Sequence, residues 1–241
     1  MSDELLRRHD NHVTRLTLNR PQKANALSAA LVEALLDAVE YAATDGTRLL
    51  IVEGNGPHFC AGFDFSDFQA QSEGDLALRF IRIETLLQAL YHAPYATLAL
   101  AHGRVFGAGA DLVACCSLRV AAADTTFRMP GLRFGVVLGT RRLAQRIGAD
   151  RARDILATSR TFDAAQALAN GFLTGIAPQD QWPALAGDTQ AAAEALTPAA
   201  AAALHRCVIT DSRAADMAEL ARSVSTPGLK ERIRRYRESG K

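Results

Sequence analysis

The 241-residue sequence predicts an α/β domain in which largely parallel strands are joined by helical crossovers. Strand-like apolar runs alternate with segments of helical periodicity over about the first 140 residues. Beyond that point the sequence is almost wholly helical in character. At this length the chain can bury a core without staples such as disulfides, and its apolar content of 49% is near the average for soluble domains.

Composition excludes several function classes. The 27 basic and 26 acidic residues nearly balance, so we expect neither nucleic acid nor a membrane as a partner. No apolar run reaches the ~18 residues of a spanning helix. The N-terminal "MSDELLRRHDN" is too polar for a secretory signal, which predicts a cytoplasmic protein. The four cysteines show no C-x-x-C spacing, and we expect reduced thiols.

The first elements follow from periodicity. "HVTRLTLNRP" places Thr14, Leu16 and Leu18 on one face, as in a half-buried strand. Apolar residues then recur at helical spacing over 27–39, with Ser28 as a candidate N-cap.

Later elements are predicted in the same way. The continuous apolar run at 49–52 is typical of a buried strand. A helix over 75–92 and the strand "ATLALAHG" follow, and "SLRVAAADTTFRMP" indicates another short strand and turn. The Ala-rich segment 184–204 suggests packed helices, one of which begins at Pro198. The basic tail is either a solvated terminal helix or an arm that binds an anionic ligand or a neighbouring subunit.

The stretch "HGRVFGAGADL" at 102–112 is the most informative segment. It lacks the third glycine of a dinucleotide fingerprint and the lysine of a P-loop, so neither nucleotide site is expected. Its glycines permit a tight turn and close packing of a helix. The amides at that helix start could also hold an oxyanion. Ala108 and Asp111 would lie on the same side of the first turn, although Asp111 could equally be a favourable charge at a helix N-terminus.

Four stretches, at 19–28, 49–65, 93–137 and 148–176, together resemble the crotonase, or enoyl-CoA hydratase/isomerase, superfamily. The resemblance implies a spiral of ββα turns over 1–180 and a helical trimerisation region over 181–241. It implies an acyl-CoA thioester as substrate, as in fatty acid metabolism, with no permanently bound cofactor or metal. A homotrimer or a dimer of trimers is the assembly it implies.

The resemblance also implies functional residues. By motif position, the backbone amides of Ala61 and Ala108 form the oxyanion hole, and Asp111 is the candidate acid/base. Substrate-binding positions carried over from the family are Lys23, Ala24, Ala26, Cys60, Ala61, Gly62, Phe63, Asp64, Gly107, Ala108, Gly131 and Lys230.

The sequence departs from the family at the second carboxylate. Hydratases of the family use two glutamates, and Asp111 and Gly131 occupy those positions here. Glycine cannot carry a proton, so hydration shared between two carboxylates is not expected. Leu138 replaces a proline in a shortened glycine-rich loop beside the acyl site.

Three functions remain open at this point. The first is hydratase/isomerase-like enolate chemistry with a single carboxylate. The second is isomerisation or decarboxylation, and the third is a catalytically silent acyl-CoA-binding homologue. Dehalogenation is disfavoured because 132–146 lacks an Asp nucleophile. A nucleophilic Cys60 beside His58 is a further alternative, weakened because sequence neighbours seldom face each other.

Overall fold

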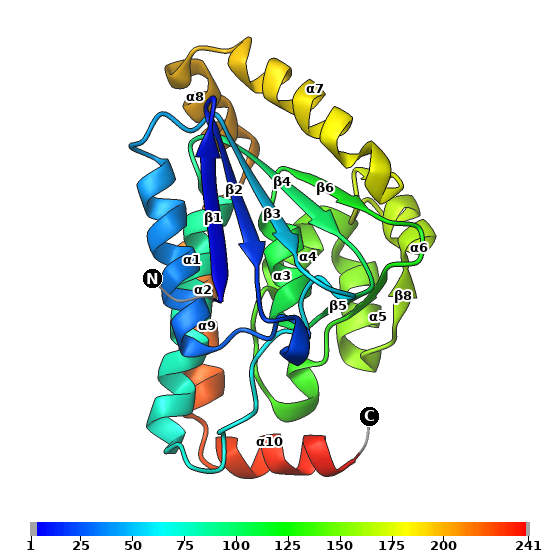
Figure 1. Cartoon of the computed structure of the whole chain (residues 1–241). Helices are drawn as coiled ribbons and strands as arrows, with labels where there is room; N and C mark the ends of the chain where they lie inside the picture. The colour runs from blue at the N-terminus through cyan, green and yellow to red at the C-terminus, as the bar shows by residue number, and fades with distance from the viewer. Residues whose placement is uncertain (1–3, 240–241) are drawn as a thin grey trace.

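A six-stranded sheet forms the centre of the computed structural model, which describes residues 4–239 (Figure 1). In spatial order its strands are β1 (Leu5–Asp10), β2 (Val13–Leu18), β3 (Leu49–Gly54), β4 (Ala96–Ala101), β6 (Leu118–Ala121) and β9 (Gly175–Ile176). β1 pairs antiparallel with β2, and every other pairing in this sheet is parallel. The expected parallel α/β arrangement is confirmed.

A second, three-stranded sheet contains β5 (Arg104–Phe106), β7 (Thr126–Arg128) and β8 (Phe162–Asp163). The chain alternates between the two sheets, passing from β4 to β5, back to β6 and across again to β7. Single β-bridges join Leu27 to Phe63 and Cys60 to Val105. The chain therefore winds as a spiral, and segments far apart in the sequence meet where its turns lie side by side.

Helices surround these sheets (Figure 1). They are α1 (Ala29–Ala42), α2 (Glu73–Tyr91), α3 (Ala108–Cys115), α4 (Thr140–Ile147), α5 (Ala149–Thr158), α6 (Ala164–Ala169), α7 (Trp182–Glu194), α8 (Pro198–Val208), α9 (Arg213–Ser225) and α10 (Leu229–Glu238). Three short 3₁₀ helices are η1 (Pro21–Lys23), η2 (Gly131–Phe134) and η3 (Gln179–Gln181). α9 packs against α2, and α10 packs against η2 and α2, so the C-terminal helices return to the core.

The apolar patterns correspond to two buried layers. Along β2, Thr14, Leu16 and Leu18 are fully buried and alternate with partly exposed residues, as expected. In β3, Leu50 and Val52 face the large core beneath α1 and α2. Leu49 and Ile51 face a smaller core that includes Trp182 of α7. Burial on both faces explains why this strand is apolar at successive positions.

Capping residues fix several helix boundaries. The Ser28 side chain accepts a hydrogen bond from the Leu31 N–H at the start of α1, as predicted. Pro198 opens α8 behind the cap Thr197. α10 confirms a terminal helix in the basic tail. Among the helices of residues 4–239, none combines the length and the apolar character that a bilayer crossing requires.

Sequence reasoning missed β1 and β5, and also the two-residue strands β8 and β9 in the part of the chain that was predicted to be almost wholly helical. β1 is an edge strand whose residues after the first are all exposed, so it lacks the alternation that marks a half-buried strand. β5 has three residues and lies inside the glycine-rich segment. The segment predicted as one short strand and turn contains two strands, β6 and β7, in different sheets.

Candidate active site

The glycine-rich segment forms the turn between β5 and α3. Gly107 is the N-cap of α3 and has φ 51° and ψ −127°, a conformation that favours glycine. A Cβ on Gly109 would lie 2.5 Å from the Cys60 carbonyl oxygen, so only glycine allows α3 to pack this closely on residues 59–62. The turn thereby places the start of α3 beside the "CAGF" segment at 60–63.

Three backbone N–H groups at this junction have no hydrogen-bond acceptor within residues 4–239: those of Phe63, Ala108 and Gly109. Of these three residues, Phe63 and Ala108 line the adjoining cavity. A Cβ on Gly62 would lie 3.1 Å from the Ala108 nitrogen, so the two chain segments are in close contact. The prediction that Ala61 supplies an oxyanion-hole amide is wrong in this structure, because its N–H donates to the Ala24 carbonyl over 2.9 Å. The free donor lies two residues further on, at Phe63.

A largely apolar cavity of about 110 Å³ adjoins these donors. Several aromatic side chains line it, and neighbouring rings contact one another at centroid distances of 4.3–6.3 Å. Its lining residues are Ala61, Phe63, Phe65, Phe80, Phe106, Gly107, Ala108, Asp111, Arg128, Met129, Pro130, Gly131, Leu132, Phe134, Val136, Leu138, Thr140, Leu156 and Tyr236.

Asp111 contributes a buried carboxyl group to the cavity wall. Its Oδ1 atom has no hydrogen-bond partner among the described residues. Desolvation raises the pKa of Asp111 from the usual 3.8 to about 8, and this shift is opposed by the positive charge of Arg142 and reinforced by the negative charge of Glu84. The carboxyl group is therefore mainly protonated at neutral pH.

Two neighbouring features hold Asp111 in this state. Gly139 leaves the space that the carboxyl group occupies, because a Cβ there would lie 1.7 Å from Oδ1. Arg142, in the first turn of α4, forms a buried two-pronged ion pair with Glu84 of α2, in which Nη1 and Oε1 are 2.9 Å apart and Nη2 and Oε2 are 2.5 Å apart. Because Glu84 neutralises Arg142, the guanidinium group only partly offsets the desolvation of Asp111.

Gly131 also lines the cavity and contributes no ionisable group. Its carbonyl accepts a hydrogen bond from the Val136 N–H, and an added Cβ would lie 3.0 Å from the Val136 carbonyl oxygen. A larger side chain at this position therefore requires η2 or the following loop to shift. Among the residues that line the cavity, Asp111 is the only carboxyl group.

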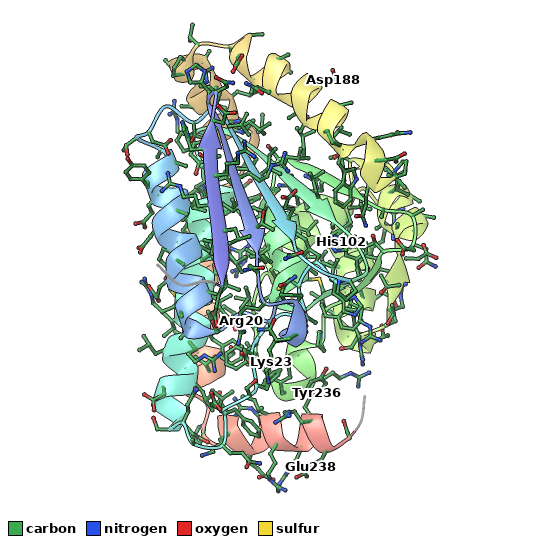
Figure 2. The ribbon with its side chains drawn as sticks, in the orientation of Figure 1. Arg20, Lys23, His102, Asp188, Tyr236 and Glu238 are labelled. Atoms are coloured by element: carbon green, nitrogen blue, oxygen red, sulfur yellow. The ribbon has the colours of Figure 1, made fainter. Side chains whose placement is uncertain are left out.

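Several predicted substrate-binding residues lie outside this cavity. They are Lys23, Ala24, Ala26, Cys60, Gly62, Asp64 and Lys230. Asp64 forms an ion pair with Arg20 at 2.8 Å, and the Lys230 ammonium donates to the carbonyls of Gln69 and Gln71 in its own chain. Lys23 is exposed on η1 (Figure 2). A role for these residues in binding the coenzyme stays a prediction.

Cys60 is not arranged as a nucleophile. The residue is fully buried, and its Sγ atom contacts the Asn25 carbonyl oxygen at 3.1 Å. Burial raises the pKa of the Cys60 thiol to about 12. His58 Nδ1 instead accepts a hydrogen bond from the Arg104 N–H. All four cysteines are free thiols, as expected.

The sequence analysis did not identify the aromatic residues that line the cavity from α2, η2 and α10. Phe80 reaches it from α2, Phe134 from η2 and Tyr236 from α10. Figure 2 shows Tyr236 on the side of α10 that faces the rest of the molecule, with Glu238 on the opposite side. A pattern of apolar residues marks such side chains as buried, but it does not show which of them meet around one cavity.

Comparison with known proteins places this geometry in a family. The enoyl-CoA hydratase/isomerase family model matches residues 8–236. The 2,3-dehydroadipyl-CoA hydratase of Escherichia coli is 32% identical over 182 residues, covering 73% of this chain and 70% of that protein. An enoyl-CoA isomerase/hydratase of Mycosarcoma maydis is 29% identical over 225 residues, covering 88% and 81% of the two chains.

A solved structure from Bordetella parapertussis, described at family level as an enoyl-CoA hydratase/isomerase, superposes with a TM-score of 0.96. It is 52% identical to this chain, and the match covers 98% of each. The likeness therefore extends over the core and the C-terminal helices alike. The chain belongs to the enoyl-CoA hydratase/isomerase family, the crotonase superfamily that its sequence resembles.

Proposed function

We propose that the protein is an acyl-CoA-processing enzyme that stabilises a thioester enolate with two backbone amides and transfers protons with a single carboxyl group. The amides are those of Phe63 and Ala108, and the carboxyl group is that of Asp111. One observation carries the proposal: a buried carboxyl group with an unpartnered oxygen adjoins the same cavity as two unpartnered N–H donors.

The two amides act on the thioester carbonyl. The positive end of the α3 dipole lies behind the Ala108 N–H, so negative charge on the carbonyl oxygen is favoured there. Preorganised donors of this kind stabilise an enolate more than they stabilise the ground state, because the oxygen gains charge in the transition state. The apolar cavity excludes water from the developing anion.

Asp111 is best suited to donating a proton. Its pKa of about 8 leaves the carboxyl group mostly protonated near neutral pH, so it can protonate an enolate carbon directly. After ionisation the same group can remove a proton, which would allow isomerisation between two carbons within its reach. Two-carboxylate hydration has no second participant because Gly131 lacks a side chain.

Decarboxylation of a malonyl-type thioester is a second candidate, favoured by the protonated state of Asp111. In that reaction the bond between the α-carbon and the substrate carboxylate breaks and carbon dioxide leaves. The bonding electron pair becomes the enolate, and the α-carbon takes the proton of Asp111. Water then reprotonates Asp111. This route requires no base at the start of the cycle.

Turnover of 2-enoyl, 3-enoyl and malonyl-type CoA thioesters tests the proposal. We expect Asp111→Asn to reduce the active turnover at least about tenfold, since positioned proton transfer contributes about 10²- to 10⁴-fold. Asp188→Asn is the matched control, because Asp188 is exposed on α7, far from Tyr236 (Figure 2). Calorimetry with the same thioesters separates binding from chemistry.

Each outcome decides between the open functions. Unchanged turnover in Asp111→Asn would remove Asp111 from the mechanism. Binding of thioesters without turnover of any of them would support a catalytically silent binder. If no thioester binds the wild-type protein, both the enzyme and the binder are excluded.

A further inference from the structure

Three arginines surround a cleft of about 480 Å³ between η2 and α10: Arg128, Arg133 and Arg232. Each is held by a backbone carbonyl group. Arg128 Nε donates to the Ser159 oxygen at 3.0 Å and Arg133 Nη2 to the Thr158 oxygen at 2.6 Å. Arg232 Nε donates to the Phe134 oxygen at 3.1 Å. The guanidinium groups are thus fixed in place by neutral acceptors.

None of these three arginines forms an ion pair with a carboxylate of residues 4–239. The arginine next to them in the cleft, Arg235, is neutralised by Glu231 at 2.7 Å. The cleft therefore concentrates uncompensated positive charge in a chain whose overall net charge is only +1. Arg232 also donates to the Ser223, Thr226 and Pro227 carbonyls, so the free N–H donors around the cleft belong mainly to Arg128 and Arg133. Such donors are suited to a carboxylate or a phosphate.

The arginine cleft adjoins the acyl cavity. Arg128, Phe134 and Tyr236 line both spaces. Burial raises the pKa of the Tyr236 hydroxyl group, and the nearby positive charges of Arg128 and Arg133 oppose that shift. Phe134 and Tyr236 therefore stand between the two spaces, and a ligand in the apolar cavity reaches the arginines once it passes these two side chains.

We propose that the arginine cleft binds a carboxylate at the distal end of the acyl group, so that the substrate class is an α,ω-dicarboxylic acyl thioester. This inference rests on the proposed function, because it assumes that the thioester lies at Phe63 and Ala108. The phosphates of coenzyme A also carry negative charge, but the whole pantetheine arm separates them from the thioester. The cleft adjoins the acyl cavity directly, which favours a group attached to the acyl chain.

Binding of matched thioesters by calorimetry tests this inference. Butanoyl-, hexanoyl- and octanoyl-CoA are compared with succinyl-, adipoyl- and suberoyl-CoA, which carry a carboxylate in place of the terminal methyl group. We expect the wild-type protein to bind the dicarboxylic thioester at least about tenfold more tightly at one of the three lengths, as a charge-assisted hydrogen bond allows. Arg128→Gln and Arg133→Gln should each reduce that preference.

A control variant and a thioester carrier without phosphates show whether the preference for dicarboxylic thioesters depends on the cleft. Arg151→Gln removes one exposed positive charge from α5, away from the cleft, and should keep the preference. The N-acetylcysteamine thioesters lack all phosphates and should show the same preference for the dicarboxylic member. Arg133→Gln should disturb the fold less than Arg128→Gln, because Arg133 is exposed. Measurements of thermal unfolding and molecular mass check that each variant keeps its fold and its assembly.

Three results would overturn the inference. The first is the absence of a dicarboxylic preference at every length in a protein that binds acyl-CoA. The second is an equal loss of affinity for both thioester classes in the arginine variants, which would assign the cleft to the phosphates. The third is a change in subunit number, which would assign it to an interface. Failure of the wild-type protein to bind any acyl-CoA would instead refute the proposed function.

Discussion

Asp111 shows how one residue acquires its chemical state from its surroundings. Its carboxyl group is buried, its Oδ1 atom lacks a partner among the described residues, and the space it occupies exists because residue 139 is glycine. A charge near a helix N-terminus would ordinarily be stabilised by the helix dipole. Desolvation outweighs that effect here and keeps the proton on the carboxyl group.

The raised pKa predicts a specific dependence of stability on pH. The unfolded chain ionises Asp111 near 3.8, whereas the folded protein retains the proton until about pH 8. Between these values the folded state binds more protons, so the free energy of unfolding falls as pH rises, by at most about 1.4 kcal/mol per unit. Above about pH 8 the loss is complete. In Asp111→Asn this contribution is absent.

Urea unfolding of the wild type and of Asp111→Asn at several pH values between 4.5 and 8.5 measures the effect. We expect the stability of the wild type relative to the variant to decline steadily over this range. Parallel pH profiles for the two proteins would show that Asp111 is ionised in the folded state. Asp188→Asn, which changes an exposed carboxylate, should give a profile parallel to the wild type.

Local motifs predicted only one of the two backbone N–H groups proposed to bind the oxyanion. The sequence correctly places Ala108 at the start of a helix, because the glycines and the apolar run that follows are local signals. It does not show that the Ala61 N–H is already taken, because its acceptor, the Ala24 carbonyl, is brought there by tertiary structure. The free donor at Phe63 is therefore identified only once the hydrogen bonds are known.

At the scale of elements, strands were predicted correctly where one face of the strand is buried or where both faces are. The alternation in β2 reflects burial of one face, and the apolar run in β3 reflects burial of both faces. β1 was missed because an exposed edge strand needs no such pattern. The aromatic wall of the cavity was missed for a different reason: α2, η2 and α10 each contribute one ring, and their meeting depends on how the elements pack.

For the buried Arg142–Glu84 pair, which joins α4 to α2, we expect the effects of single substitutions on the free energy of unfolding to be strongly non-additive. Removing one partner leaves a buried charge uncompensated, so Glu84→Leu and Arg142→Met should each destabilise the protein by about 3–5 kcal/mol. The double variant should be far more stable than the sum of the two effects implies, because neither charge remains. Denaturant unfolding of the four proteins measures the coupling.

The partly exposed pair Arg82–Glu33, which joins α2 to α1, is the control. Its single variants, Arg82→Met and Glu33→Leu, should cost less than about 1 kcal/mol, because water screens both partners. If the buried pair gave effects as small as these, Arg142 would have to be compensated by another group. Asp216, whose Oδ2 atom is 3.7 Å from Arg142 Nη1, would be the first candidate.

At the scale of the whole molecule, the cavity is assembled from segments that run from residue 61 to residue 236. α10 supplies Tyr236, and its attachment to the core therefore controls how well the cavity is closed. Leu229 and Ile233 are buried in the main core, and the Glu73 carboxylate accepts hydrogen bonds from the Gly228 and Lys230 backbone N–H groups, both at 3.2 Å. Glu73 thus caps α10 from α2.

Glu73→Ala should therefore loosen α10 without unfolding the core. Loss of a charged cap should lower the free energy of local opening of α10 by about 1 kcal/mol. Amide hydrogen exchange over 229–238 should then be roughly fivefold faster. Exchange in β3 and β4 should be unchanged, because these strands open only with the whole domain. Asp188→Ala, at an exposed position on α7, is the control. Equal acceleration in all elements would mean that α10 and the core unfold as one unit, and unchanged exchange in α10 would mean that Leu229 and Ile233 suffice to hold it.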